Sequence, residues 1–329
     1  MRRSLSAVTL IAGVLSGCRG ERATPAAAPP ATPAADVSHG EAAIGAADTA
    51  PVDAMAPSRT TTTLRHVRIE IRHVKIAVAH GATYDAWSFD GRVPGPFIRV
   101  TQGDTVDFTL VNRAPIPHSM DFHAAEVAPN RVYVNVIPGD SLQYRFVARV
   151  PGAFLYHCGT APVAMHIANG MYGAIIVDPR QPRPAAREFV LVQSEFYTQH
   201  AAGADSNTLA LDWQKLLGLA PDYVTFNGRA AQYATAPLRV KPGEPVRFYV
   251  VNAGPNRISA FHVVGAIFDR VFLDGSATAT LNGVQTVDVP VGGGAVFELH
   301  LAEAGDYPFV THAFADATKG AVGVVLAKP

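Results

Sequence analysis

The 329 residues of the chain favour two domains by the usual length of a domain, and the 48% of residues that are hydrophobic can form a large core. The 27 basic and 27 acidic side chains give a formal net charge of zero. The sequence contains no basic run and no basic stretch interleaved with aromatic residues, which argues against a nucleic-acid partner.

The N-terminus has the pattern of an export signal. Two arginines precede a largely apolar run that ends at Leu15, and small residues lead from there to Cys18. The run is too short to span a bilayer. Its ending resembles that of a bacterial lipoprotein signal, so we expect residues 1–17 to be removed and Cys18 to be acylated. An ordinary cleaved signal is the alternative. Either signal predicts export, to the periplasm or outer membrane of a bacterium, and acylation would anchor the protein at Cys18.

Residues 18–60 are rich in alanine, proline and threonine and contain few large apolar side chains. They cannot bury enough surface to fold, and we expect a disordered tether.

From about residue 61 the pattern changes to short, alternating, β-branched segments separated by glycine, proline and asparagine. Such segments occupy residues 67–71, 97–100, 105–111, 142–147 and 174–177. Short strands at short intervals predict a β-sandwich. Helical patterns are confined to residues 209–219 and a possible turn at 163–168.

The sequence also repeats itself. The segment 99–112 begins Arg-Val-Thr-Gln-Gly-Asp and recurs as 239–252, which begins Arg-Val-Lys-Pro-Gly-Glu. The repeat predicts an all-β protein with two related β-sandwich domains in tandem, domain 1 over residues 61–180 and domain 2 over residues 181–329.

Soft metal ligands gather in domain 1, where His157, Cys158, His166 and Met171 lie within fifteen residues. Two imidazoles, one thiolate and a weak axial thioether form the ligand set of a type 1 copper site. If Cys18 is acylated, Cys158 has no disulfide partner, and metal ligation is the simplest use of a lone thiol in an oxidising compartment. The alternative is a buried free cysteine among core residues.

Strand alternation divides the candidate ligands into two sets. His118 and His123 are an odd number of residues apart and His157 and Cys158 are adjacent, so in extended strands each pair points to opposite faces. One set would contain Cys158 and one upstream histidine, and the other would contain His157 and the second upstream histidine. The loop after Cys158 could complete the first set, whereas the second set lacks a third ligand.

These motifs resemble those of the copper-containing nitrite reductases, in particular the subgroup with a short Cys-to-His loop that includes lipid-anchored outer-membrane members. The motifs that carry the resemblance are residues 118–123, 157–158, 165–171, 259–265 and 310–314. The resemblance extends from about residue 64 to the end. It implies two cupredoxin-like Greek-key domains with one type 1 and one type 2 copper per subunit.

The resemblance also assigns ligands. It implies that the type 1 copper is held by His118, Cys158, His166 and Met171. It implies that the type 2 copper is held by His123, His157 and His312. Met120 and Met165 are rival axial ligands of the type 1 copper, but the family pattern favours Met171. In that family the third type 2 histidine comes from a neighbouring subunit, which implies a homotrimer.

The implied activity is the one-electron reduction of nitrite to nitric oxide. The electron would enter at the type 1 copper and pass through Cys158 and His157 to the type 2 copper. Asp121 and His262 would supply protons, Val264 would line the substrate pocket, and Thr286 would orient His262. The sequence has no Cys-x-x-Cys-His haem motif, so we expect a separate small donor protein, either a cupredoxin or a cytochrome c.

Two positions depart from the family pattern. Residues 124–137 replace a stretch that is Gly-rich in many members, and Gln285 stands where an acidic residue is common. The first departure lies close to the predicted pocket, so the sequence does not predict how substrate reaches that pocket. Histidines outside the motifs, among them His73, follow no recognisable pattern and are interpreted as incidental.

Two other functions remain as alternatives. A two-domain laccase-like multicopper oxidase needs several His-x-His pairs, but none of the twelve histidines forms one, and Gly159 stands where such a cluster would need histidine. A non-enzymatic cupredoxin electron carrier would have no use for the second set of ligands.

Overall fold

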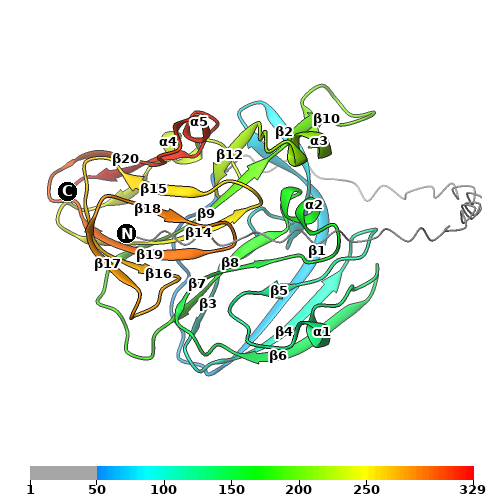
Figure 1. Ribbon diagram of the computed structural model, residues 1–329, viewed down its shortest axis with the longest axis horizontal. Helices are drawn as coiled ribbons and strands as arrows, with labels where there is room; N and C mark the ends of the chain where they lie inside the picture. The colour runs from blue at the N-terminus through cyan, green and yellow to red at the C-terminus, as the bar shows by residue number, and fades with distance from the viewer. Residues whose placement is uncertain (1–49) are drawn as a thin grey trace, which may run out of the picture. The chain divides into compact units, whose positions relative to one another are not determined.

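The computed structural model describes residues 50–329, which form four β-sheets with five short helices in the connections (Figure 1). The predicted signal and the acylation site Cys18 lie outside the described residues. The helices are α1 (Pro129–Val132), α2 (Val163–Ala168), α3 (Trp213–Leu217), α4 (Gln232–Thr235) and α5 (Phe314–Ala317). None of the described helices is long and apolar enough to cross a membrane.

Domain 1 is a sandwich of two sheets. Sheet 1 has, in order, β10 (Thr198–His200), β11 (Thr208–Leu211), β2 (Ala82–Phe89), β1 (Leu64–Ala79), β4 (Thr105–Asn112) and β6 (Ser141–Val147). Sheet 2 has β3 (Ile98–Thr101), β8 (Tyr172–Asp178), β7 (Gly152–His157) and β5 (Asp121–Phe122). The core between the two sheets of domain 1 contains Phe108 of sheet 1 and Tyr156 of sheet 2, both fully buried.

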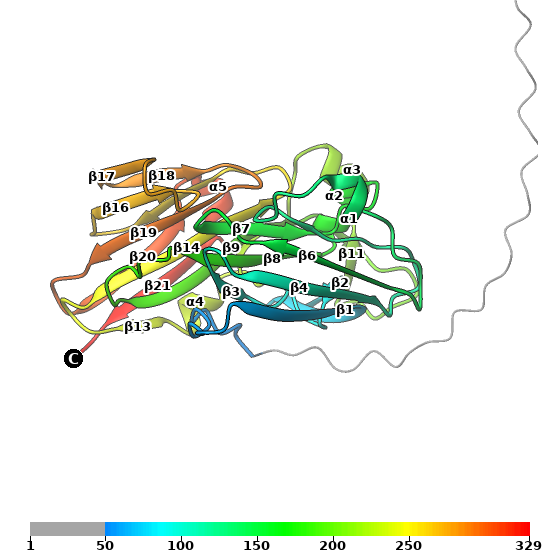
Figure 2. The ribbon, with the colours of Figure 1, turned by 90° about the horizontal axis from the view of Figure 1, so that it is seen from below.

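Domain 2 is the second sandwich. Sheet 3 has β12 (Tyr223–Phe226), β9 (Arg187–Phe196), β14 (Pro245–Gly254), β19 (Gly294–His300), β16 (Phe268–Leu273) and β17 (Thr280–Val284). Sheet 4 has β13 (Leu238–Val240), β21 (Val322–Ala327), β20 (Gly305–Thr311), β15 (Ser259–Val263) and β18 (Thr286–Val289). Figure 2 shows β1 of domain 1 and β17 of domain 2 at opposite ends of the molecule.

A third apolar core joins the domains. Leu155 and Ile176 of sheet 2 face away from the domain 1 core and pack with Val192 and Tyr249 of sheet 3. Sheets 2 and 3 are therefore buried on both faces, and accordingly β8 is buried along its whole length and β9 from Phe189 onward. This shared core makes the two domains one compact unit.

The sequence repeat has a structural reason. Asn112 and Asn252 end its two copies, and both are fully buried. The Asn112 amide donates to the carbonyl oxygens of Ile116 and Val136, and its oxygen accepts from a backbone N–H two residues on. Asn252 makes the same set of bonds to its own neighbours. Each asparagine thus holds the loop after the equivalent strand, β4 or β14. In domain 1 this loop carries His118.

The structure differs from the sequence predictions at two boundaries, those of a helix and of the tether. Residues 209–219 are not one helix: Leu209 and Leu211 pack into the interdomain core as part of β11, and only α3 is helical. The predicted tether ran to residue 60, but Ala54 is buried in the domain 2 core. Its carbonyl accepts from the N–H of Val190, and the N–H of Val52 donates to the side-chain oxygen of Gln232 on α4. These bonds make residues 52–56 part of the folded domain.

Candidate metal centres

Cys158 and His157 point to opposite sides of sheet 2, as strand alternation predicts. Cys158 is fully buried in the domain 1 core. His157 lies directly opposite Asp121 in the β5–β7 pair, so these two side chains share the other face of the sheet. One peptide bond therefore separates two clusters of metal-ligating side chains.

The first cluster, which we call site 1, contains His118, Cys158 and His166, all buried, with their ligand atoms within 4.8 Å of one another. His166 Nδ1 lies 3.2 Å from Cys158 Sγ and 3.1 Å from His118 Nδ1. His118 Nδ1 lies 3.9 Å from the same sulfur. The backbone N–H of Ser119 donates to Sγ at 3.3 Å. These three side chains supply one thiolate and two imidazoles, the donor types that a type 1 copper site requires.

Met171 is fully buried in the same core as Cys158. Its carbonyl accepts from the Cys158 N–H, and its own N–H donates to the carbonyl of His166, so the chain holds it beside both ligands. Met120 is also fully buried in this core. The assignment of Met171 as the axial ligand stays a prediction.

Burial keeps the imidazoles of site 1 in the form that binds a metal. It lowers the pKa of His118 to about 3, with a further contribution from His166, and lowers the pKa of His166 to about 4. Both rings are therefore neutral at physiological pH. A neutral imidazole is the form that ligates.

The second cluster, site 2, contains Asp121, His123 and His157. The two Nε2 atoms lie 3.1 Å apart, and Asp121 Oδ2 lies 3.8 Å from that of His157 and 4.0 Å from that of His123. Each Nδ1 donates to a carbonyl oxygen, that of Cys158 at 2.9 Å and that of Gly292 at 3.0 Å. These bonds fix both rings with Nε2 directed at one point, as in metal sites whose ligating histidines are held from behind.

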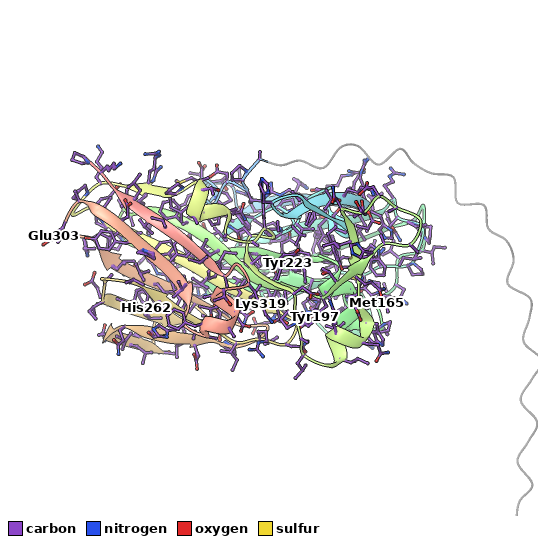
Figure 3. The ribbon with its side chains drawn as sticks, turned by 90° about the horizontal axis from the view of Figure 1, so that it is seen from above. Met165, Tyr197, Tyr223, His262, Glu303 and Lys319 are labelled. Carbon is purple, nitrogen blue, oxygen red and sulfur yellow. The ribbon has the colours of Figure 1, made fainter. Side chains whose placement is uncertain are left out.

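The third predicted ligand of site 2 is elsewhere in the chain. Among the described residues, the group around His157 does not include His312. His312 is exposed at the end of β20, where its ring lies 5.4 Å from that of His262 and 4.6 Å from that of Phe314. Figure 3 shows His262 in a different half of the molecule from Met165, which lies beside site 1 on α2. One chain thus holds two separate parts of the predicted catalytic site.

The structure places the other predicted pocket residues around His262. Its Nδ1 donates to the carbonyl of Gln285 at 2.7 Å and lies 3.3 Å from the hydroxyl of Thr286. Gln285 thus contributes through its backbone, which any residue at this position supplies. Val264 is exposed on the same strand end. We call His262, Val264, Thr286 and His312 the domain 2 half-site.

The segment 124–137, which lacks the Gly-rich pattern, packs against the residues that directly follow Cys158. It forms α1, and the ring of Tyr133 lies against Gly159: a Cβ atom at 159 would come within 1.7 Å of the phenol. The hydroxyl of Thr160 donates to Asn135 at 2.9 Å. A histidine at 159, which a trinuclear copper cluster would need, therefore has no room unless Tyr133 moves.

Two residues of this region follow no sequence motif. His73 of β1 and Trp87 of β2 are directly paired across the strands, and their rings stack behind His118 and His166. Burial, with a further contribution from His166, lowers the pKa of His73 to about 4. Only the pairing of β1 with β2 could have revealed these residues.

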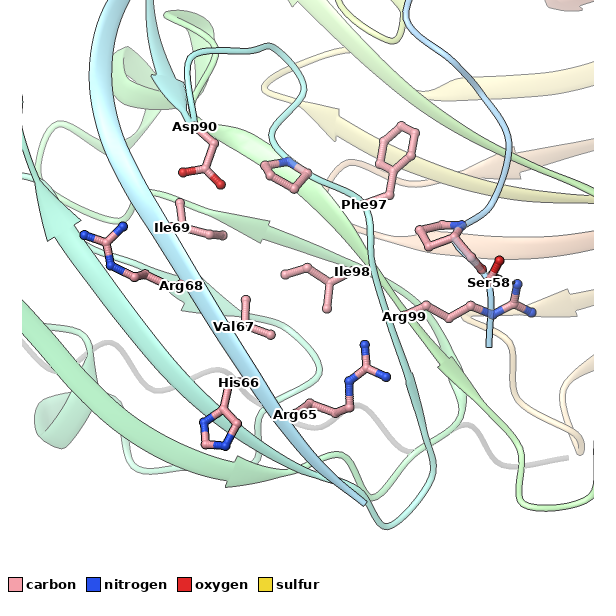
Figure 4. Close-up of a pocket in the computed structure, with 12 residues that line it drawn as sticks. Ser58, Arg65, His66, Val67, Arg68, Ile69, Asp90, Phe97, Ile98 and Arg99 are labelled. Atoms are coloured by element: carbon pink, nitrogen blue, oxygen red, sulfur yellow. Dashed lines mark hydrogen bonds between the residues drawn. The ribbon is translucent and has the colours of Figure 1, made fainter. Parts of the chain in front are cut away.

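A cleft of about 260 Å³ lies between β1 and β3 (Figure 4). It is lined by side chains that include Arg65, Arg68 and Arg99, and by none of the predicted site residues. The metal centres are therefore distinct from this cleft.

Comparisons with known proteins identify the family of the chain. A family model described as multicopper oxidase matches residues 70–182, and a second of the same description matches residues 187–326. The copper-containing nitrite reductase of Neisseria gonorrhoeae is 38% identical over 98% of this chain and 86% of its own length. That of Neisseria meningitidis serogroup B is 41% identical over 78% of this chain and 67% of its own length.

Solved structures give the same relationship. The copper nitrite reductase from Nitrosomonas europaea superposes with a TM-score of 0.75 at 38% identity, over 80% of this chain and 94% of that one. The copper-containing nitrite reductase of Thermus scotoductus gives a TM-score of 0.73 at 33% identity, over 80% of this chain and 62% of that one. These similarities confirm the two cupredoxin-like domains. The chain belongs to the copper-containing nitrite reductases, a family of oxidoreductases.

Proposed function

We propose that this protein reduces nitrite to nitric oxide at a copper in site 2, with electrons that arrive through a copper in site 1. The observation that carries the proposal is the placement of the adjacent residues His157 and Cys158 in two different ligand clusters. A single peptide then connects the site that receives the electron to the site that uses it. The names of the relatives support nitrite as the substrate.

The donor sets suit copper. Site 1 offers one thiolate and two imidazoles in a dry environment, a soft set that copper prefers, and Met171 would add a thioether as a fourth ligand. When bound there, copper supplies a centre that takes up and releases one electron. Site 2 offers two imidazoles with their Nε2 atoms 3.1 Å apart and has its open side toward Asp121. On these donor sets we propose one type 1 and one type 2 copper per subunit.

We propose that the third ligand of site 2 is His312 of a second copy of this chain. In one chain His312 is exposed and lies outside the His123–His157 cluster. Large apolar side chains are exposed on domain 2 at Ile258, Val264, Ile267 and Phe314. Such side chains are typical of a surface that a partner covers. A cyclic homotrimer would place the domain 2 half-site of each subunit against site 2 of the next.

In the assembled site, Asp121 and His262 would face the bound nitrite from two sides. The reaction adds one electron and two protons to nitrite, breaks one N–O bond, and releases nitric oxide and water. The Asp121 carboxyl lies on the open side of the two imidazoles, where it can hold a proton within reach of a nitrite oxygen. His262 keeps its Nδ1 on the Gln285 carbonyl, which leaves Nε2 to give the second proton.

Electron delivery requires a partner, because the chain has no second redox motif. We propose a small cupredoxin or cytochrome c that reduces site 1. We also propose export and a lipid anchor at Cys18, which would keep the enzyme in the periplasm or at the outer membrane. The laccase-like alternative is disfavoured by the packing of Tyr133 on Gly159, and the electron-carrier alternative by the ordered histidines of site 2.

The test is nitric oxide release by the copper-loaded protein with nitrite and a reduced artificial donor. Electron paramagnetic resonance of the same sample should show two kinds of copper. A single copper signal, or no nitric oxide from the fully loaded protein, would overturn the proposal.

A further inference from the structure

His73 lies behind site 1 in a position that the sequence motifs do not explain. It is on β1, directly opposite Trp87 of β2. The two rings stack with their centroids 5.1 Å apart and 8° between their planes. The Trp87 ring in turn packs edge-on against both imidazoles of site 1, at 4.8 Å from His166 and 5.6 Å from His118. The stacking holds the ring of His73 in one orientation.

The ring of His73 meets His118 on the side away from the sulfur. Nε2 of His73 lies 3.3 Å from Nε2 of His118, and the rings meet edge-on at 80°. The other nitrogen of His118, Nδ1, faces the Cys158 sulfur and the Nδ1 atom of His166. The two nitrogens of His118 therefore have separate tasks: Nδ1 is directed into the ligand cluster, and Nε2 is directed at His73.

The chemistry of a ligating imidazole decides the direction of this hydrogen bond. When Nδ1 of neutral His118 binds a metal, its proton must be on Nε2. That N–H needs an acceptor, and the atom beside it is Nε2 of His73. His73 must then carry its own proton on Nδ1.

We propose that His73 is a positioning residue of site 1, which accepts the proton of His118 Nε2–H and so fixes the tautomer and orientation of that ligand. The inference rests on the proposed function, because it requires copper in site 1. An acceptor behind a ligating imidazole makes the imidazole a stronger electron donor. A stronger donor favours the oxidised copper ion over the reduced one, so His73 lowers the reduction potential of site 1.

The experiment compares two substitutions that separate the hydrogen bond from the packing. His73→Phe keeps a ring that can stack on Trp87 but has no acceptor. His73→Gln loses the ring but keeps a side-chain carbonyl that can accept. His66→Phe is the matched control, because His66 lies on the same strand and its side chain is 71% exposed. If His73→Phe fails to bind copper, His73→Leu replaces it.

The readouts are the reduction potential and the electron paramagnetic resonance spectrum of the thiolate-bound copper, which do not depend on turnover. Substitution of a residue that hydrogen-bonds to a metal ligand typically costs about 10- to 100-fold in metal affinity, and a tenfold loss for the oxidised ion alone raises the potential by about 59 mV. We expect an increase of at least this size in His73→Phe and a much smaller one in His73→Gln. His66→Phe should match the wild type.

The outcomes distinguish this inference from the proposed function. Equal shifts in the Phe and Gln variants, or no shift in His73→Phe relative to His66→Phe, would overturn the role of His73 while site 1 stands. Wild-type protein that shows no thiolate-to-copper absorption when loaded would overturn the proposed function itself, and this inference with it.

Discussion

The carboxylate of Asp121 faces the ring of His157 across the paired strands β5 and β7, with 3.8 Å between Oδ2 and Nε2. The pairing register sets this distance, because residues directly opposite each other in an antiparallel pair point to the same face. The acid is thereby fixed beside the two imidazoles of site 2 without a long loop, while 43% of its side chain remains exposed.

We predict that Asp121→Asn lowers nitrite reduction by about 100- to 10,000-fold, the range that general acid catalysis contributes. Asparagine keeps the shape of the side chain but cannot hold a transferable proton, so the copper content should not change. The measurement is the rate of nitric oxide release beside copper analysis. Asp140→Asn, at an exposed turn of the same domain, is the control. Wild-type activity in the Asp121→Asn variant would exclude it as a proton donor.

The split of the catalytic site gives a second prediction. His123→Ala and His312→Ala should each abolish nitric oxide release, because each removes one imidazole from site 2. The blue or green thiolate colour of site 1 should persist in both. A mixed assembly of the two variants should recover activity, because some contacts then join an intact His123 of one subunit to an intact His312 of another.

The control for the mixed assembly is an equivalent mixture of His123→Ala with His157→Ala. Both losses then fall on the same half of the site, so no contact between subunits restores it. Recovery in this control, or no recovery in the first mixture, would contradict a site shared between copies.

In Cys158→Ala the colour and the electron input should disappear together. A coloured Cys158→Ala protein would overturn the ligand assignment of site 1.

The sequence predicts those features of the sites that depend on neighbouring residues, but not those that depend on how distant strands pair. Strand alternation is local, and it correctly places His157 and Cys158 on opposite faces. The role of His73 depends on the register between β1 and β2, which the positions of the histidines in the sequence do not reveal. The placement of His312 beside His262 likewise depends on the pairing of β15 with β20.

Tertiary packing also overrides local propensity. Residues 209–211 look helical in sequence, but they pair with β2 and β10 because Leu209 and Leu211 add apolar surface to the interdomain core. Residues 52–56 are poor in large apolar side chains, but they bond to the backbone of β9 and so become ordered. Neither outcome depends on the segment alone.

The packing of Tyr133 on Gly159 gives a further prediction. Gly159→Ala should lower the free energy of unfolding by about 1–3 kcal/mol, the usual cost of adding a methyl group where there is no space. Removal of the opposing ring should relieve the clash. We therefore expect Gly159→Ala to cost less in a Tyr133→Ala background than alone, as a double-mutant cycle by denaturant unfolding would show. Additive effects would mean that the two residues do not contact.

Glu188 gives the fifth prediction, because it links the domains. Its carboxylate lies 2.7 Å from Arg99 of domain 1 and 2.6 Å from Arg247 of domain 2, and both guanidinium groups are almost fully buried. Burial raises the pKa of Glu188, but the bonds and charges of the arginines outweigh this and lower it to about 2. Removal of this charge should destabilise the protein by up to about 3–5 kcal/mol, because two buried cations each lose one carboxylate and keep only Asp178 or Glu298 as a partner.

The pH dependence follows from the direction of this shift. A carboxylate whose pKa is lower in the folded state contributes its full stability above its unfolded pKa, near 4.5, and loses it as the pH falls toward about 2. Wild-type protein should therefore lose stability between pH 4.5 and 2 more steeply than Glu188→Gln, in unfolding measured by circular dichroism. The exposed Glu303→Gln should follow the wild-type curve. Glutamine at 188 cannot take up the proton that the native glutamate binds on unfolding. A Glu188→Gln curve parallel to that of the wild type would therefore show that another carboxylate controls acid stability.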